Sequence, residues 1–340
     1  MNNEPRIAPQ AEIDWPLFRK RITAARRVLL TSHVRPDGDS IGSEIAMFRA
    51  MQMLGKEVRI VNDHAVPPSL CFLDPDHAIT QLSRLNDMER KWMDTIDLFW
   101  VVDTSSWMQL GDMGPVFEES SAQKIVLDHH SVGHNLCEEM FVDPTAEATG
   151  TLCVQAVKEL GLSLTPEIAV PIFVAIATDT GWFRFNTVRS LTFQTIAELT
   201  DAGVQTDTMY RILYEQESLG RVRLIGRALE RTESYLDGAF VFCWLTLQDF
   251  DELQALPNDS EDIVNMPLRI GGTKFAVLMT EQNAGGYKVS FRSRCHIDCG
   301  RLAAMFQGGG HKQASGATLF GSFEECKQKV LNAVMEAFKN

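Results

Sequence analysis

The sequence lacks an excess of positive charge. Its 340 residues include 32 Lys and Arg against 45 Asp and Glu, which gives a formal net charge of -13. Proteins that hold long nucleic acid normally present a basic surface to the phosphates, so we expect no tight binding of long duplex nucleic acid. A short anionic substrate, held by a local basic patch, is still compatible with this charge.

A disulfide framework, a signal peptide and a membrane span are also missing. The seven cysteines are odd in number and irregularly spaced, which indicates reduced thiols. Residues 1–10 are polar and lack the apolar core of a signal peptide. The longest apolar run, around residues 169–177, is too short to cross a bilayer. These absences predict a cytoplasmic protein with no membrane partner.

The first 200 residues show a regular alternation of apolar runs and helical patterns. Strands are expected at 27–32, 57–61, 97–102 and 124–127, and helices at 40–54, 149–160, 166–178 and 191–201. Gly55 and Gly203 fit helix ends, and Thr149, Thr165 and Pro166 fit helix starts. This order predicts an α/β fold, with a mostly parallel sheet and helices on both of its faces.

The pattern changes after a polar, mixed segment at 203–220, which we interpret as a connector. Strands are expected at 239–245, 274–280 and 287–292, and helices at 248–256, 261–265, 299–306 and 322–338. These elements predict a smaller α+β domain. We therefore divide the chain into a first domain at 1–200, a linker at 201–220 and a second domain at 221–340.

Asp and His residues gather in four short segments, each placed where an apolar run stops. The segments are residues 33–40, 101–106, 126–130 and 176–180. A parallel α/β sheet collects such ends in one crevice. Carboxylates and imidazoles suit Mn²⁺, and these four segments contain enough of them for two divalent ions. Two adjacent metals are a device for hydrolysing phosphate esters.

Taken one at a time, most of these residues also have plain structural explanations. Asp37 and Asp39 could belong to a helix-capping loop. Asp103 could cap the turn that follows it, and Asp179 could form a turn. The Asp-His-His triplet at 128–130 is harder to explain by packing, because three titratable residues in a row at the end of an apolar strand are rarely needed there.

In their order along the chain, the four segments resemble the DHH phosphoesterase superfamily, which is named for the triplet at 128–130. The resemblance extends to the second domain, where Gly-Gly-Gly-His at 308–311 follows the segment around Arg292, as in the DHH-associated C-terminal domain. One departure is Gln307, where many relatives have another glycine. The two-domain length and the motifs look most like the nano-RNase type, the bifunctional oligoribonucleases and 3′-phosphoadenosine-5′-phosphate (PAP) phosphatases.

The resemblance implies a role for each residue. One metal would be held by His33, Asp37 and Asp103, and the other by Asp39, Asp103, His129 and Asp179. The catalytic residues would be Asp103, Asp128 and His130, with Asp128 orienting an imidazole and His130 reaching the substrate phosphate. The substrate-binding residues would be Arg292, Gly309, Gly310 and His311. The four ligand aspartates carry as much negative charge as two divalent ions carry positive charge, so metal binding should also stabilise the domain.

The second domain carries a local positive charge. Between residues 266 and 320, seven Lys and Arg stand against two acidic residues, a local net charge of +5. A solvated basic face is the plain explanation, but these charges flank the three glycines, whose N–H groups can approach an anion closely. So small a cluster suits one or two phosphates, which limits the substrate to something short.

We therefore expect a two-metal phosphoesterase that hydrolyses di- to pentanucleotides of RNA, PAP, or both. Manganese is the expected ion, with magnesium and cobalt as alternatives. The alternative activity is that of a cyclic- or linear-dinucleotide phosphodiesterase, and the alternative class is a catalytically silent nucleotide sensor. The expected partners are short single-stranded RNA or a small nucleotide, and a homodimer is left open.

Overall fold

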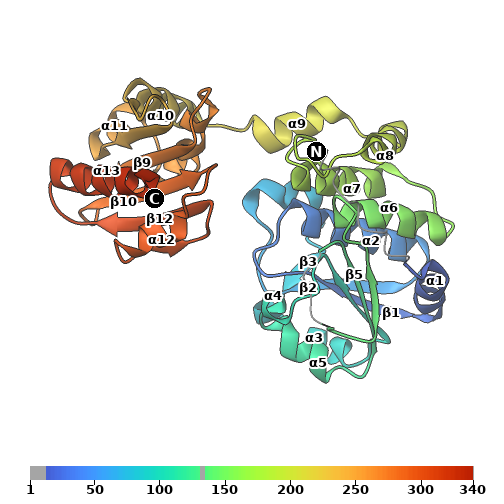
Figure 1. Cartoon of the computed structure of the whole chain (residues 1–340). Helices are drawn as coiled ribbons and strands as arrows, with labels where there is room; N and C mark the ends of the chain where they lie inside the picture. The colour runs from blue at the N-terminus through green and yellow to red at the C-terminus, as the bar shows by residue number, and fades with distance from the viewer. Residues whose placement is uncertain (1–12, 131–134, 340) are drawn as a thin grey trace. The chain divides into compact units, whose positions relative to one another are not determined.

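The computed structural model describes residues 13–130 and 135–339, so the polar segment at 1–10 lies outside the described residues. The chain divides into two units, Met1–Glu215 and Gln216–Asn340. Each unit contains a six-stranded sheet with helices packed on it (Figure 1). The predicted fold class, α/β followed by a smaller α+β domain, is confirmed. No helix in the described ranges is long and apolar enough to cross a membrane.

The sheet of the first unit is parallel throughout, with the strand order β3-β2-β1-β4-β5-β6. The strands are β1 (Arg27–Thr31), β2 (Glu57–Asn62), β3 (Ile79–Gln81), β4 (Leu98–Val102), β5 (Gln123–Asp128) and β6 (Glu139–Val142). The chain builds outward from β1 to β3, then returns beside β1 at β4 and builds outward to β6. Such a reversal leaves a crevice at the carboxyl ends of the two central strands, which are β1 and β4 here.

Helices cover both faces of this sheet. One face packs against α1 (Trp15–Ala24), α2 (Gly38–Met53), α6 (Thr149–Glu159) and α7 (Pro166–Asp179), and the other against α3 (Asp87–Met93) and α5 (Met113–Glu119). Alternate strand residues supply the two cores, since Val28 and Leu30 contribute to the first and Leu29 to the second. The central strands are therefore apolar throughout, and polar residues enter only at their ends.

Small residues let three helices approach one another closely above the crevice. A Cβ atom added at Gly42 of α2 would lie 2.3 Å from the carbonyl oxygen of Pro171 in α7. One added at Gly150 of α6 would lie 2.6 Å from the Cβ of Ala175, also in α7. This spacing brings the first turns of α2 and α6 to the C-terminal end of α7, where the candidate ligands lie.

The first unit continues through α8 (Ser190–Asp201) and α9 (Thr206–Tyr214). The segment predicted as a linker at 201–220 therefore contains a helix, and the division between the units falls after Glu215. The helix α9 is strongly amphipathic, with Met209 buried and Tyr210 packed on Trp182. Its polar residues belong to the solvent side, which explains why the segment reads as polar and mixed.

The second unit has the strand order β11-β12-β10-β9-β8-β7. Its strands are β7 (Glu233–Tyr235), β8 (Phe240–Leu245), β9 (Phe275–Glu281), β10 (Tyr287–Ser293), β11 (Gly309–Gly310) and β12 (Ala314–Leu319). Only the β8–β9 pair is parallel. Helices α10 (Leu219–Glu230) and α11 (Leu247–Leu253) belong to one core, and α12 (Cys299–Ala304) and α13 (Phe323–Lys339) to the other. The helix predicted at 261–265 is instead a short 3₁₀ turn, Ile263–Asn265.

Replacing Gly42 by alanine should destabilise the first unit by about 1–3 kcal/mol, because the added methyl group overlaps backbone of α7 that cannot move freely. Chemical denaturation of the full chain measures the change. The matched control is Gly114→Ala in α5 of the same unit, where the new methyl would meet its nearest neighbour at an ordinary 3.7 Å. Equal stabilities for the two variants would contradict the close helix approach.

Candidate metal centre

The predicted metal ligands come together at the carboxyl end of the first sheet. His33 follows β1, Asp103 follows β4 and His129 follows β5, while Asp39 lies in the first turn of α2 and Asp179 ends α7. Two groups consist only of predicted ligands, and in each of them the ligand atoms lie within 4.8 Å of one another. One is His33, Asp37 and Asp103, and the other is Asp39, His129 and Asp179. A third such group, Asp103, His129 and His130, overlaps both.

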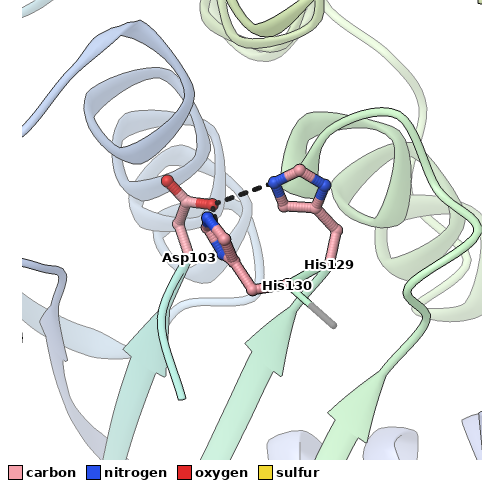
Figure 2. Close-up of side chains that lie close together, drawn as sticks. All are labelled: Asp103, His129 and His130. Atoms are coloured by element: carbon pink, nitrogen blue, oxygen red, sulfur yellow. Dashed lines mark ion pairs between the residues drawn. The ribbon is translucent and has the colours of Figure 1, made fainter. Parts of the chain in front are cut away.

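Asp103 lies between the two groups. Its Oδ2 is 3.4 Å from Nε2 of His33. Its Oδ1 is 3.8 Å from Nε2 of His129, and Figure 2 shows this pair. The residue has φ +63°, a left-handed conformation that Asp tolerates better than most residues. Thr149 Oγ1 donates a hydrogen bond of 2.8 Å to Oδ1. Oδ2 thus faces the first group and Oδ1 the second, an arrangement that allows two ions to share this carboxylate.

Asp39 is buried against the start of α6. Its carboxylate accepts hydrogen bonds from the backbone N–H groups of Thr149, at 2.7 Å, and Gly150, at 2.9 Å. These groups form the positive end of the helix, which favours a negative charge. Thr149 was predicted as the N-cap, but the N-cap is Ala148, and the hydroxyl of Thr149 bonds Asp103 instead. The start of α6 therefore holds two of the candidate ligands.

Both candidate ligand histidines are oriented through their Nδ1 atoms. Nδ1 of His33 lies 2.8 Å from the carbonyl oxygen of Val34, and Nδ1 of His129 lies 3.3 Å from that of Ala146. A carbonyl oxygen can only accept, so Nδ1 carries the proton and donates it. This leaves Nε2 of each ring facing the carboxylates, and an unprotonated Nε2 is the form that a metal requires.

Burial and mutual repulsion disturb the titration of this cluster. Burial raises the pKa of Asp39, and burial together with the charge of Asp39 raises the pKa of Asp103 well above its usual range. The same two causes raise the pKa of Asp179 to about 6. Burial opposes protonation of His33, but its contacts with Asp103 and Asp37 outweigh this and raise its pKa to about 11.

No Lys or Arg forms an ion pair with the four ligand aspartates in the parts of the chain that the structure describes. Buried carboxylates normally require a paired positive charge. The chemistry of the donor set, carboxylate oxygens with imidazole nitrogens that bind a metal once they lose their proton, suits divalent cations such as Mn²⁺. These residues therefore fit a pair of divalent ions.

His130 and Asp128 form a separate pair beside this cluster. His130 Nδ1 lies 2.7 Å from Oδ1 of Asp128, which also accepts a hydrogen bond from the backbone N–H of His130. The bond to Asp128 is the main reason why the pKa of His130 is raised to about 9. The His130 side chain is 44% exposed and lies 3.9 Å from Oδ1 of Asp103. It is therefore a cationic ring on the open side of the cluster.

The predicted substrate-binding residues lie in the second unit. Arg292 belongs to β10, and its Nη2 donates to Oδ1 of Asp262 at 3.1 Å. It lines a cavity of about 300 Å³ together with Lys288, Ser290 and Ser315. Glu261 and Asp262 also line it, so the cavity combines two cations with two carboxylates and four hydroxyl groups.

Gly309 and Gly310 pair with β12 as the short edge strand β11, and His311 follows them. The three glycines have different reasons for being glycine. A Cβ atom would overlap Gly316 O at Gly308 and Ser315 Cα at Gly310, whereas Gly309 has nothing within 4 Å. Packing thus accounts for the first and third glycines but not for the middle one. Gln307 has φ +59°, which explains why a glycine suits that position.

A buried polar network behind the cluster was not predicted. Glu44 of α2 accepts a hydrogen bond of 2.8 Å from Nδ2 of Asn62, whose Oδ1 accepts one of 3.1 Å from the N–H of Ser32. Burial raises the pKa of Glu44 to about 8. The network fixes the end of β1, from which His33 emerges. The sequence does hint at this network, because Glu44 comes three residues after Ile41 and therefore lies on the apolar face of the helix, where a charged residue is unusual.

In the metal-free protein, Asp179→Asn should become more stable relative to wild type as the pH rises from about 4 to about 6. The pKa of Asp179 is about 6 in the folded protein and 3.8 in the unfolded chain. Protonation of Asp179 therefore stabilises the folded wild type fully below pH 3.8, and this stabilisation is lost as the pH rises through 6. Asparagine does not titrate, so the variant keeps its stability over this range. Thermal unfolding in a chelator, at a series of pH values, gives the difference in Tm.

The control for this experiment is Asp201→Asn, at the exposed end of α8. Added Mn²⁺ should stabilise the wild type more as the pH rises, since the ions compete with protons for the same atoms. A Tm difference between Asp179→Asn and wild type that does not change with pH would contradict the electrostatic description of the cluster.

Comparisons with known proteins match both units. Residues 27–176 match the DHH family, N-terminal domain, and residues 241–340 match the DHHA1 domain. The chain is 30% identical to the "Bifunctional oligoribonuclease and PAP phosphatase NrnA" of Thermus thermophilus, over 91% of this chain and 89% of that protein. It is 25% identical to the protein of the same name from Bacillus subtilis, over 86% and 89%. The first matched range includes every candidate metal ligand except Asp179.

One solved structure is similar over nearly the whole chain. It is the crystal structure of an exopolyphosphatase-related protein from Bacteroides fragilis, with a TM-score of 0.80 and 28% identity. The match covers 98% of this chain and 97% of that one. The architecture of both units is therefore shared with a protein solved by experiment.

Proposed function

Because the chain belongs to the DHH family, we propose that it is a two-metal phosphoesterase that hydrolyses short oligoribonucleotides and PAP. The observation that carries the proposal is the pair of ligand groups that meet at Asp103. The printed activity of the 30% identical relative, an oligoribonuclease and PAP phosphatase, supports the choice of substrate.

The ligands divide between two ions, for which we propose Mn²⁺. His33, Asp37 and Asp103 would hold one, while Asp39, His129, Asp179 and the shared Asp103 would hold the other. When bound, the ions supply Lewis acidity that activates a water molecule and offsets charge on the phosphoryl oxygens. Asp103 keeps the two positions together, and the start of α6 keeps Asp103 and Asp39 in place.

His130 contributes the positive charge that the protein itself brings to the phosphate. Its hydrogen bond to Asp128 raises its pKa and so favours the protonated ring, and its side chain is 44% exposed. Asp128, which is buried, holds Nδ1 and so leaves Nε2–H to donate to a phosphoryl oxygen. Asp128 is thus a positioning residue and His130 a phosphate-binding one.

The second unit supports a short substrate. Its cavity of about 300 Å³, next to Arg292 and Lys288, is at the small end of the range for ligand sites. Arg292 can grip a phosphate with two nitrogens, and Gly309 and His311 can add donors. The chain as a whole carries a net charge of -13, so a long polyanion gains little beyond this patch.

With Mn²⁺, the wild type should cleave pApA and PAP rapidly and a long single-stranded RNA slowly. The Asp103→Asn variant should have a kcat lower by roughly 10³-fold or more, because the ligand common to both ions is lost. Steady-state kinetics on this panel, with cyclic-di-AMP included, makes the test. Far-ultraviolet circular dichroism checks that the variant is folded. Rapid cleavage of the long strand without activity on pApA would contradict the short-substrate proposal, and preference for cyclic-di-AMP would favour a cyclic-dinucleotide phosphodiesterase.

Replacing Arg292 by alanine should raise KM for pApA by about 10- to 100-fold with a smaller effect on kcat, because a charge-assisted hydrogen bond to the substrate is lost. The matched control is Arg301→Ala in the same unit, since the side chain of Arg301 is 91% exposed. If the two variants change KM equally, a diffuse basic surface accounts for binding and a specific contact of Arg292 does not.

A further inference from the structure

The loop that follows Asp179, a proposed metal ligand, presents an exposed aromatic ring. Phe185 is 53% exposed, yet its ring is packed against Gly181. A Cβ atom at Gly181 would lie 2.5 Å from Cζ of the phenyl ring. Gly181 is only two residues from Asp179, so the ring lies directly next to a proposed ligand along the chain.

The backbone of this loop is tied to the buried residue that follows Asp179. The carbonyl oxygen of Thr180 accepts hydrogen bonds from the N–H groups of Arg184, at 3.0 Å, and Phe185, at 3.2 Å. The hydroxyl of Thr180 accepts another, of 3.1 Å, from the N–H of Phe183. Thr180 itself is fully buried. The backbone of Phe185 is therefore fixed by the residue that directly follows α7.

The loop reaches this shape through an unfavourable backbone path. Gly181, Trp182 and Phe183 have φ values of +56°, +59° and +61°. Two successive aromatic residues in the left-handed region are costly, and such strain persists where surrounding packing enforces it. Here the rings of Trp182 and Phe183 both pack on Phe173 of α7. Trp182 and Phe183 are thus packed on α7 in a strained backbone conformation, while Phe185 remains exposed to solvent.

A positive charge accompanies the exposed ring. Arg184 is exposed, and its Nε donates a hydrogen bond of 2.6 Å to the carbonyl oxygen of Gly181, the residue on which the ring of Phe185 packs. Within the described residues no carboxylate pairs with this guanidinium. An aromatic face with a nearby arginine is the combination by which proteins bind single-stranded nucleic acid without reading its sequence.

We propose that Phe185 stacks against a nucleobase of the substrate whose phosphate lies at the metal centre, with Arg184 as the adjacent cation. The inference rests on the proposed function and deepens it. Every base has a π-face, so a stacking contact tolerates any sequence. The same contact would serve an oligoribonucleotide of any composition and the adenine of PAP. Phe185 is then a specificity-determining residue, which selects nucleotides over other phosphate esters.

The test uses the full chain loaded with Mn²⁺ and compares pApA with its two singly abasic analogues. Phe185→Ala should raise KM for pApA by about 5- to 150-fold, the range measured for loss of one stacked base, and leave kcat within about twofold. For one of the two abasic analogues, Phe185→Ala and wild type should have the same KM. Phe185→Tyr should behave like wild type, whereas Phe185→Leu, which is apolar but not aromatic, should behave like the alanine variant.

The matched control is Phe193→Ala in α8, where the ring is 56% exposed but packs on Phe183. It should leave KM unchanged. Equal effects of Phe185→Ala on pApA and on both abasic analogues, or wild-type KM in Phe185→Leu, would overturn the stacking proposal. Failure of the proposed function looks different, since the wild type itself would then be inactive on pApA and PAP. An unchanged Mn²⁺-induced rise in Tm for Phe185→Ala shows that the metal centre is intact.

Discussion

The mutual repulsion of four carboxylates at one end of a parallel sheet is the constraint on which the rest of the first unit depends. Asp39 and Asp103 are almost completely buried, and neither has a Lys or Arg partner within the described residues. The surrounding structure offsets part of this cost with the N–H groups at the start of α6 and the hydroxyl of Thr149. The remainder calls for bound cations. The site lies at the carboxyl ends of β1 and β4, from which the chain continues in opposite directions along the sheet, and such a reversal leaves a crevice for a ligand.

Much of this centre could be predicted from the sequence because ligands must occur where apolar strands stop. The residues after β1, β4 and β5 and at the end of α7 were all assigned in advance, and the structure places them in two groups that meet at Asp103. The supports could not be predicted in the same way. Thr149 looks like an ordinary helix cap, and its contact with Asp103 depends on how α6 packs on α2 and α7. The carbonyl groups that orient His33 and His129 leave no trace in side-chain identity at all.

The fold, too, could be predicted from the sequence only in part. Long apolar strands and capped helices were predictable, whereas the edge strands β3 and β6 have only three and four residues and little apolar pattern. The segment at 201–220 was predicted as a linker because its helix α9 is amphipathic and lies at the surface. In the second unit, the glycine motif at 308–310 suggested an anion-binding loop, but two of its three glycines are required by the close approach of β12. Conformation and function both select glycine there, and sequence alone cannot separate them.

The central claim is that Asp103 bridges two ions, and electron paramagnetic resonance of the Mn²⁺-loaded protein tests it most directly. Two Mn²⁺ ions about 3.5–4 Å apart that share a carboxylate should be magnetically coupled. We predict two bound ions per chain with a spin-coupled spectrum in the wild type, and loss of the coupling in Asp103→Asn. A wild-type spectrum of isolated Mn²⁺, with one ion per chain or two uncoupled ions, would contradict the account.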